Sequence, residues 1–98
     1  MAKINWTIEA ERWLKDIFDY IAEDNPRAAT RTVESIYQKT ELLLNFPKIG
    51  YRYEQILDRE VRILLYGHYR IAYVIKPNDE IDILGVFHGA LDITRYLF

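Results

Sequence analysis

The sequence has no cysteine among its 98 residues. This absence excludes disulfide bonds, cysteine nucleophiles and cysteine-ligated metal, and it suits a reducing compartment. Long hydrophobic runs are also missing: the longest are a few residues, whereas a membrane span needs about 20. The N-terminus shows no apolar stretch of signal-peptide length. We therefore expect a cytoplasmic protein with no membrane association.

Other residue types are too few or too scattered to form familiar sites. The single serine, Ser35, falls in a predicted helix rather than on a glycine-rich elbow. The four glycines stand singly, so they form no phosphate-binding loop. The two histidines, His68 and His88, belong to no cluster with metal-ligand spacing. We expect neither a metal nor a cofactor.

Length and charge set the next limits. A chain of 98 residues predicts one domain, 1–98, which is too small for a dinucleotide fold or an α/β barrel. Its net charge of −2 is not that of a typical nucleic-acid binder. The charge is uneven, because acids exceed bases over residues 1–24 while bases exceed acids over 51–76. Arginines alternate with tyrosines in the second region, a pattern that suits either nucleic-acid contact or an ordinary exposed strand.

The first half of the chain predicts two helices. Apolar residues recur at helical spacing over 8–23, and Thr7 is placed to cap that helix. Asn25 and Pro26 suit the cap and first position of a second helix over 26–46. The short break between the helices predicts an antiparallel hairpin.

Beyond Gly50 the apolar period becomes two, which predicts three strands. Gly67 and His68 fit a two-residue turn between the first two, so the strands form an antiparallel meander. Ile4 and Trp6 suggest a short first strand, and 91–97 suggests a final helical turn. The order β-α-α-β-β-β-(α) predicts an α+β fold, a small antiparallel or mixed sheet with the helical hairpin packed on one face.

Both faces of this sheet carry apolar residues. Alternation assigns one set to the face under the helices: Val61, Ile63, Leu65, Ile71, Tyr73, Ile75, Ile81, Ile83 and Phe87. It assigns a second set to the other face: Leu64, Ala72, Val74, Leu84 and Val86. That second face is either open to a partner or covered by the segment 90–98.

Metal-free RNA cleavage is one chemistry that the residues allow. It needs an acid, a base and cations around the crowded phosphate. Arg62 and Arg70 share the same alternation, which predicts that they lie on one face, and His88 or Tyr96 would titrate nearby. Each residue also has an ordinary structural reading as a solvated, capping or core side chain.

Several local motifs, in this order along the chain, resemble the RelE/ParE superfamily of toxins from bacterial type II toxin–antitoxin systems. The residues that carry the resemblance span almost the whole chain: Trp6, Ala10, Leu14, 20–26, Ala28, Ala29, 46–50, 59–62, 69–73 and 83–92. RelE-like members resemble ribosome-dependent ribonucleases that cleave mRNA, with basic residues on the sheet. ParE-like members are associated instead with poisoning of DNA gyrase.

The sequence resembles the ParE-like group more closely. Arg70 matches the family's sheet arginine, but Leu64 stands where a ribonuclease carries a second cation. The stretch 88–92 contains no Arg or Lys, and Leu91 replaces the usual arginine. The resemblance therefore implies a non-enzymatic gyrase inhibitor. A ribonuclease acting on ribosome-bound mRNA through Arg62, Arg70, His88 and Tyr96, and an inactive homologue that only binds antitoxin, stay open.

The resemblance also implies two binding surfaces. For the target, gyrase, we expect the strand turn and the C-terminal segment to act through Tyr66, His68, Arg70, His88 and Asp92. A cognate antitoxin, ParD-like or of another family, would lay a helix and an extended segment along an apolar groove. For that groove we expect Trp13, Ile17, Tyr20, Leu64, Val74 and Leu84.

Overall fold

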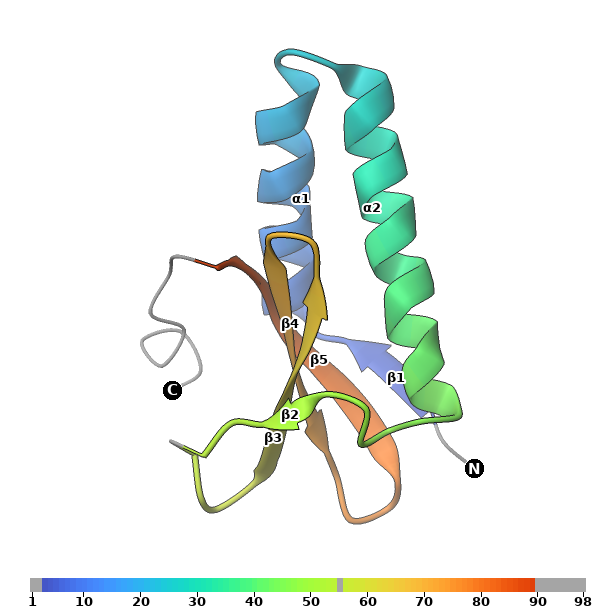
Figure 1. The fold of residues 1–98 in the computed structure, drawn as a ribbon, viewed down its shortest axis with the longest axis vertical. Coiled ribbons are helices and arrows are strands. Elements are labelled where there is room, and N and C mark those ends of the chain that lie inside the picture. The colour runs from blue at the N-terminus through green and yellow to red at the C-terminus, as the bar shows by residue number, and fades with distance from the viewer. Residues whose placement is uncertain (1–2, 55, 90–98) are drawn as a thin grey trace.

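The computed structural model describes residues 3–54 and 56–89. A helical hairpin lies on one side of a five-stranded sheet (Figure 1). The elements are β1 (Lys3–Trp6), α1 (Ile8–Ala22), α2 (Pro26–Glu41), the 3₁₀ helix η1 (Leu42–Leu44), β2 (Tyr51–Arg52), β3 (Glu60–Tyr66), β4 (Tyr69–Ile75) and β5 (Glu80–His88). The expected α+β architecture is confirmed, whereas the final helical turn expected at 91–97 lies outside the described residues.

Both long helices begin where the capping residues predict. The Thr7 side chain accepts a hydrogen bond from the Ala10 amide, and the Asn25 side chain accepts one from Ala28. The Thr7 hydroxyl also donates to the Ile83 carbonyl at 2.7 Å, which ties the start of α1 to β5. The second helix is shorter than expected, because α2 ends at Glu41 and the chain tightens into η1. No helix in the described part of the chain is long and apolar enough to cross a membrane.

The strand order in the sheet is β1-β5-β4-β3-β2. The last three strands form the expected antiparallel meander, and β1 pairs with β5 in parallel, so the sheet is mixed. The short first strand is therefore confirmed. The strand β2 was not predicted, because a two-residue strand is too short to show an alternation.

The main core lies between the sheet and the helices. Its fully or nearly fully buried members come from both helices, η1 and three strands: Ala10, Leu14, Ile36, Leu43, Leu64, Ile71, Tyr73, Ile81, Ile83 and Val86. Residues of β1 and α2 close its edge, where the rings of Trp6 and Tyr37 lie 4.6 Å apart. Burial of this apolar face explains why the helical hairpin packs where it does.

The strand register corrects the predicted assignment of faces. Paired residues in neighbouring strands point to the same side, and Leu64 pairs with Ile71 in the helix-side core. The predicted helix-side residues Val61, Ile63, Leu65 and Phe87 lie on the opposite face, whereas Leu64 and Val86 lie under the helices. Alternation identifies two sets but not the side that the helices cover. A bulge in β5 at Leu84, opposite the step from Ala72 to Tyr73, also switches the alternation along β5.

Most apolar residues of the second face are buried. Val61, Ile63, Ala72 and Phe87 have no exposed surface and form two smaller clusters. The segment between β2 and β3 covers part of this face with Tyr53 and Ile56, and Trp13 of α1 packs on Phe87 with ring centroids 4.8 Å apart. Of the residues expected on an open face, Leu64 and Val86 are buried under the helices, Ala72 and Val74 are buried on the second face, and Leu84 is half-buried. The alternative cover, 90–98, lies outside the described residues.

Candidate functional site

The turn between β3 and β4 forms one candidate site. Gly67 has φ of +56°, which glycine adopts without the steric cost of a side chain, and this allows the tight turn that the sequence predicts. The turn is joined to the end of β5, because the Gly89 amide donates to the His68 carbonyl at 2.8 Å. The hairpin tip is therefore held by hydrogen bonds and not by its apolar contacts alone.

Two histidines and a tyrosine gather at this tip. The rings of His68 and His88 lie nearly parallel with centroids 6.4 Å apart, and Tyr69 meets His88 edge-on at 6.3 Å. Burial raises the pKa of the Tyr69 hydroxyl above its ordinary value, and Tyr20 on α1 acts in the same direction. A pocket of about 470 Å³ opens here, lined by Leu65, Gly67, His68, Tyr69, Arg70, His88 and Gly89.

The structure brings together three of the five residues predicted for target contact. His68, Arg70 and His88 line the same pocket, whereas Tyr66 is half-buried against the helix-side core. Asp92 lies outside the described residues. Sequence reasoning missed Leu65 and Tyr69, because alternation marked Leu65 as core although its side chain is exposed. Both residues lie two positions from Gly67 in the sequence, and this closeness to the predicted turn is the signal that could have placed them at the hairpin tip.

The two arginines expected to share a face lie on opposite faces. Arg62 pairs with Tyr73 and so lies on the helix side, whereas Arg70 pairs with Leu65 and Phe87 on the other side. The prediction was wrong because the hairpin register pairs Leu65 with Arg70. That pairing puts odd-numbered residues of β3 and even-numbered residues of β4 on one face.

Arg62 has a structural role. Its guanidinium donates to the Gly50 carbonyl at 2.7 Å, to the Lys48 carbonyl at 3.3 Å and to the Glu60 carboxylate at 2.9 Å. The hydrogen bond from Arg62 holds the pKa of Glu60 below its ordinary value, and the charges of Lys48 and Arg52 act in the same direction. Tyr96, the expected partner in RNA cleavage, lies outside the described residues.

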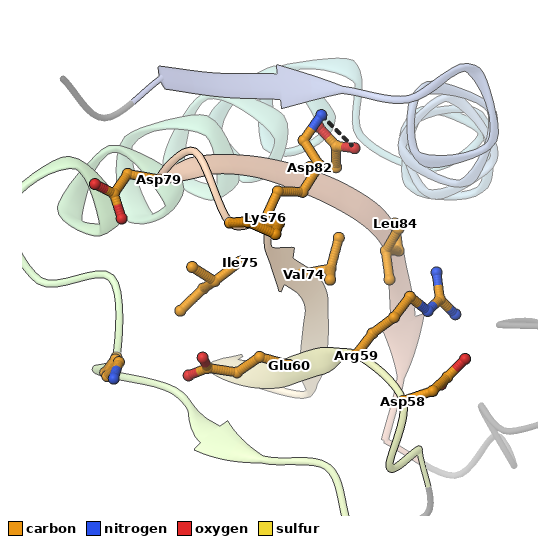
Figure 2. Close-up of a pocket in the computed structure, with 11 residues that line it drawn as sticks. Asp58, Arg59, Glu60, Val74, Ile75, Lys76, Asp79, Asp82 and Leu84 are labelled. Atoms are coloured by element: carbon orange, nitrogen blue, oxygen red, sulfur yellow. Dashed lines mark ion pairs between the residues drawn. The ribbon is translucent and has the colours of Figure 1, made fainter.

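A larger hollow of about 600 Å³ lies over the other end of the sheet (Figure 2). Its apolar lining is Val74, Ile75, Pro77 and Leu84, surrounded by charged side chains: Lys48, Asp58, Arg59, Glu60, Lys76, Asp79 and Asp82. Lys76 and Asp82 form an ion pair with a separation of 3.3 Å. Over residues 3–54 and 56–89, no three His, Asp or Glu side chains are grouped to hold a metal ion.

The residues predicted for antitoxin contact are spread over several environments. Tyr20 is 78% exposed on α1, where Trp13 and Ile17 are half-buried. Leu84 lines the larger hollow. Leu64 and Val74 are only 5% and 6% exposed, so the chain's own core occupies most of their surface. The exposed part of this set therefore lies mainly on α1.

Comparison with known proteins gives consistent matches. A family described as the ParE toxin of type II toxin–antitoxin systems, parDE, matches residues 4–93. The candidate toxin Y4kP of Sinorhizobium fredii (strain NBRC 101917 / NGR234) is 35% identical over 87 residues, which cover 89% of this chain and 88% of that protein. A solved chain of the chromosomal ParDE system from P. aeruginosa has a TM-score of 0.73 at 22% identity, covering 90% of this chain and 96% of its own, and so shares the fold.

Proposed function

We propose that this chain, which belongs to the ParE family of toxins from type II toxin–antitoxin systems, binds and inhibits DNA gyrase. The proposal includes neutralisation by a cognate antitoxin. The RelE/ParE resemblance supports this direction, because ParE-like members are associated with gyrase poisoning. The toxin would act as a binding protein, with no bond made or broken at its own residues.

The placement of the two arginines is the observation that carries the proposal. RNA cleavage requires a base, an acid and cations that converge on one phosphate. Arg62 and Arg70 point away from opposite faces of the sheet, so they do not converge on one group. Arg62 is also engaged by two backbone carbonyls and a carboxylate. This arrangement favours a protein that acts by binding its target over one that cleaves RNA.

The hairpin tip is the surface that we assign to the target. His68, Arg70 and His88 supply polar and cationic groups, and the exposed Leu65 supplies an apolar contact. Interfaces commonly combine such an apolar centre with polar neighbours. Tyr66 supports the tip from the helix side, and Asp92 remains a predicted contact.

The antitoxin would bind a surface centred on α1. Tyr20 is the most exposed of the predicted residues, with Trp13 and Ile17 as half-buried neighbours on the same helix. An amphipathic helix from the partner would lay its apolar face along this helix. Leu84 extends the predicted contact toward the sheet.

A supercoiling assay with purified gyrase tests the target. The wild-type chain should inhibit supercoiling, and His68→Ala with Arg70→Ala should raise the concentration for half inhibition by about tenfold or more. Arg31→Ala, an exposed change on α2, serves as the matched control and should inhibit like wild type. Undiminished supercoiling at a large excess of folded wild-type protein contradicts the proposal.

Two further measurements separate the alternatives. Cleavage of mRNA on translating ribosomes, lost on Arg70→Ala, would identify the chain as a ribonuclease instead. Harmless expression in a bacterial host without antitoxin would identify an inactive homologue that retains only antitoxin binding. Toxicity relieved by co-expression of an antitoxin supports the proposed role.

A further inference from the structure

The loop between η1 and β2 presents apolar side chains to solvent. Phe46 is 59% exposed and Ile49 is 50% exposed, and with Pro47 and Lys48 they line a hollow of about 410 Å³. Large apolar side chains exposed side by side on a small protein commonly mark an interaction site. We call this surface, with the neighbouring Arg52, the 46–52 loop surface.

A buried hydroxyl fixes this loop in place. Tyr73 on β4 has no exposed surface, and its hydroxyl donates to the Pro47 carbonyl at 2.7 Å. The same oxygen accepts a hydrogen bond from the Gly50 amide at 3.0 Å. One side chain of the sheet therefore holds both ends of the segment that carries Lys48 and Ile49.

Arg62 holds the loop from a second direction. Its guanidinium donates to the carbonyls of Lys48 and Gly50. The loop lies so close to β3 that a Cβ atom on Gly50 would stand 2.6 Å from the Ile63 carbonyl oxygen. Such a contact is too short for any residue but glycine, so the loop conformation depends on this close approach.

Rigid presentation matters because binding costs less when the contact residues are already ordered. A buried hydroxyl and a guanidinium hold a loop whose side chains Phe46 and Ile49 remain at least half exposed. The exposed apolar surface of Phe46 and Ile49 contributes no hydrophobic stabilisation to the folded chain by itself. A partner that buries them would gain the apolar area without the cost of ordering the loop.

The charges beside the loop indicate what kind of partner fits. Lys48 and Arg52 are both exposed, and residues 46–52 contain no Asp or Glu. The 46–52 loop surface itself is therefore positive, although Lys48 also borders the larger hollow with Asp58, Glu60, Asp79 and Asp82. A complementary segment would therefore carry carboxylates next to its apolar side chains.

We propose that the 46–52 loop surface docks an acidic segment of a protein partner, with apolar side chains covering Phe46 and Ile49 and carboxylates facing Lys48 and Arg52. This surface is distinct from the hairpin tip, because none of its residues lines the tip pocket and about 13 Å of strand separates Ile63, which pairs with β2, from the Gly67 turn. The proposal does not depend on gyrase as the target.

Selection from a random 12-residue peptide display library on the immobilised full chain tests the proposal. Peptides that compete for one site should be enriched in Asp or Glu beside Leu, Ile, Phe or Trp. Phe46→Ser with Ile49→Ser should weaken the binding of a selected peptide at least about tenfold, and Lys48→Glu with Arg52→Glu should do the same at low salt. All four side chains are exposed, so the variants should stay folded, as circular dichroism would verify.

Matched variants distinguish binding at this surface from non-specific binding to exposed apolar or charged side chains. Ile8→Ser removes an equally exposed apolar side chain on α1, and Arg31→Glu reverses an exposed charge on α2, so both should bind like wild type. Tyr73→Phe leaves the surface residues intact but releases the loop, and it should weaken the selected peptide several-fold. Peptides without acidic bias, or equal binding by the loop-surface variants, would overturn the proposal.

Two other occupants give distinct results. Binding of a fluorescent single-stranded oligonucleotide that Lys48→Glu with Arg52→Glu abolishes would assign the surface to nucleic acid. Concentration-dependent dimerisation in sedimentation, removed by Phe46→Ser with Ile49→Ser, would assign it to a second copy of the chain. Either outcome contradicts the acidic protein segment as occupant.

Discussion

Replacing Tyr73 by phenylalanine removes one oxygen atom from the core and leaves the ring in place. That oxygen makes two hydrogen bonds, to the Gly50 amide and the Pro47 carbonyl. The Tyr73 side chain and Gly50 are buried, so water does not readily replace the lost partner at the amide. Pro47 is half-buried as a residue, so its carbonyl is expected to recover a hydrogen bond with water.

The expected cost follows from this difference. Leaving a buried amide without an acceptor costs about 1–3 kcal/mol, and a lost hydrogen bond that water replaces costs about 0.5–1 kcal/mol. The unchanged ring creates no large cavity. We expect Tyr73→Phe to lower the free energy of unfolding by about 2 kcal/mol, a substantial part of the roughly 5–15 kcal/mol typical of a small domain.

Urea unfolding followed by circular dichroism measures this change. The midpoint should fall while the slope with denaturant stays constant, because the surface exposed on unfolding is almost the same. Tyr20→Phe removes a hydroxyl that is in solvent, so it should change stability by less than about 0.5 kcal/mol. A Tyr73→Phe protein as stable as Tyr20→Phe would refute the claim that this hydroxyl holds the loop.

Three other changes test the packing and the titration behaviour. Gly50→Ala should destabilise the fold by about 1–3 kcal/mol in urea unfolding, because its Cβ would stand 2.6 Å from a β3 carbonyl oxygen; Gly67→Ala meets no atom and should cost only the roughly 1–2 kcal/mol of a positive φ. Burial, with a hydrogen bond to an α1 carboxylate, raises the pKa of Tyr37 to about 12, above its ordinary value of 10. The stabilisation of the folded state that goes with this raised pKa is complete below pH 10 and is lost as pH rises toward 12. The urea midpoint of Tyr37→Phe should therefore fall less than that of wild type between pH 10 and 12. Phe87→Ala should cost about 3–5 kcal/mol and shift the fluorescence of Trp13, which packs on the ring; an unchanged emission maximum would contradict that contact.

Local structure was the part of the fold that the sequence predicted well. Thr7 and Asn25 marked the starts of both helices. The first backbone amides of a helix have no carbonyl partner within the helix, and the side-chain oxygen of a capping residue accepts a hydrogen bond from one of them. Gly67 marked the hairpin turn, because its positive φ suits glycine. Each of these signals depends on residues only a few positions apart.

The candidate site was predicted only in part. His68, Arg70 and His88 were chosen from the strand ends, and the hairpin does bring them to one pocket. Leu64 and Val74 were chosen as surface contacts but are buried. Their burial depends on which side of the sheet the helices cover and which side Tyr53 and Ile56 cover, and apolar alternation is the same for either side.

By itself, the sequence determined the order of the long helices and of the four strands it predicted, the starts of both helices and the antiparallel meander, because capping, periodicity and short turns act over neighbouring residues. Only the tertiary structure decided the parallel pairing of β1 with β5, the opposite faces of Arg62 and Arg70, and the hold of Tyr73 on the loop ending at Gly50. These features join residues that lie far apart in the chain. They depend on sheet register and on mutual burial, which no local pattern of residue types encodes.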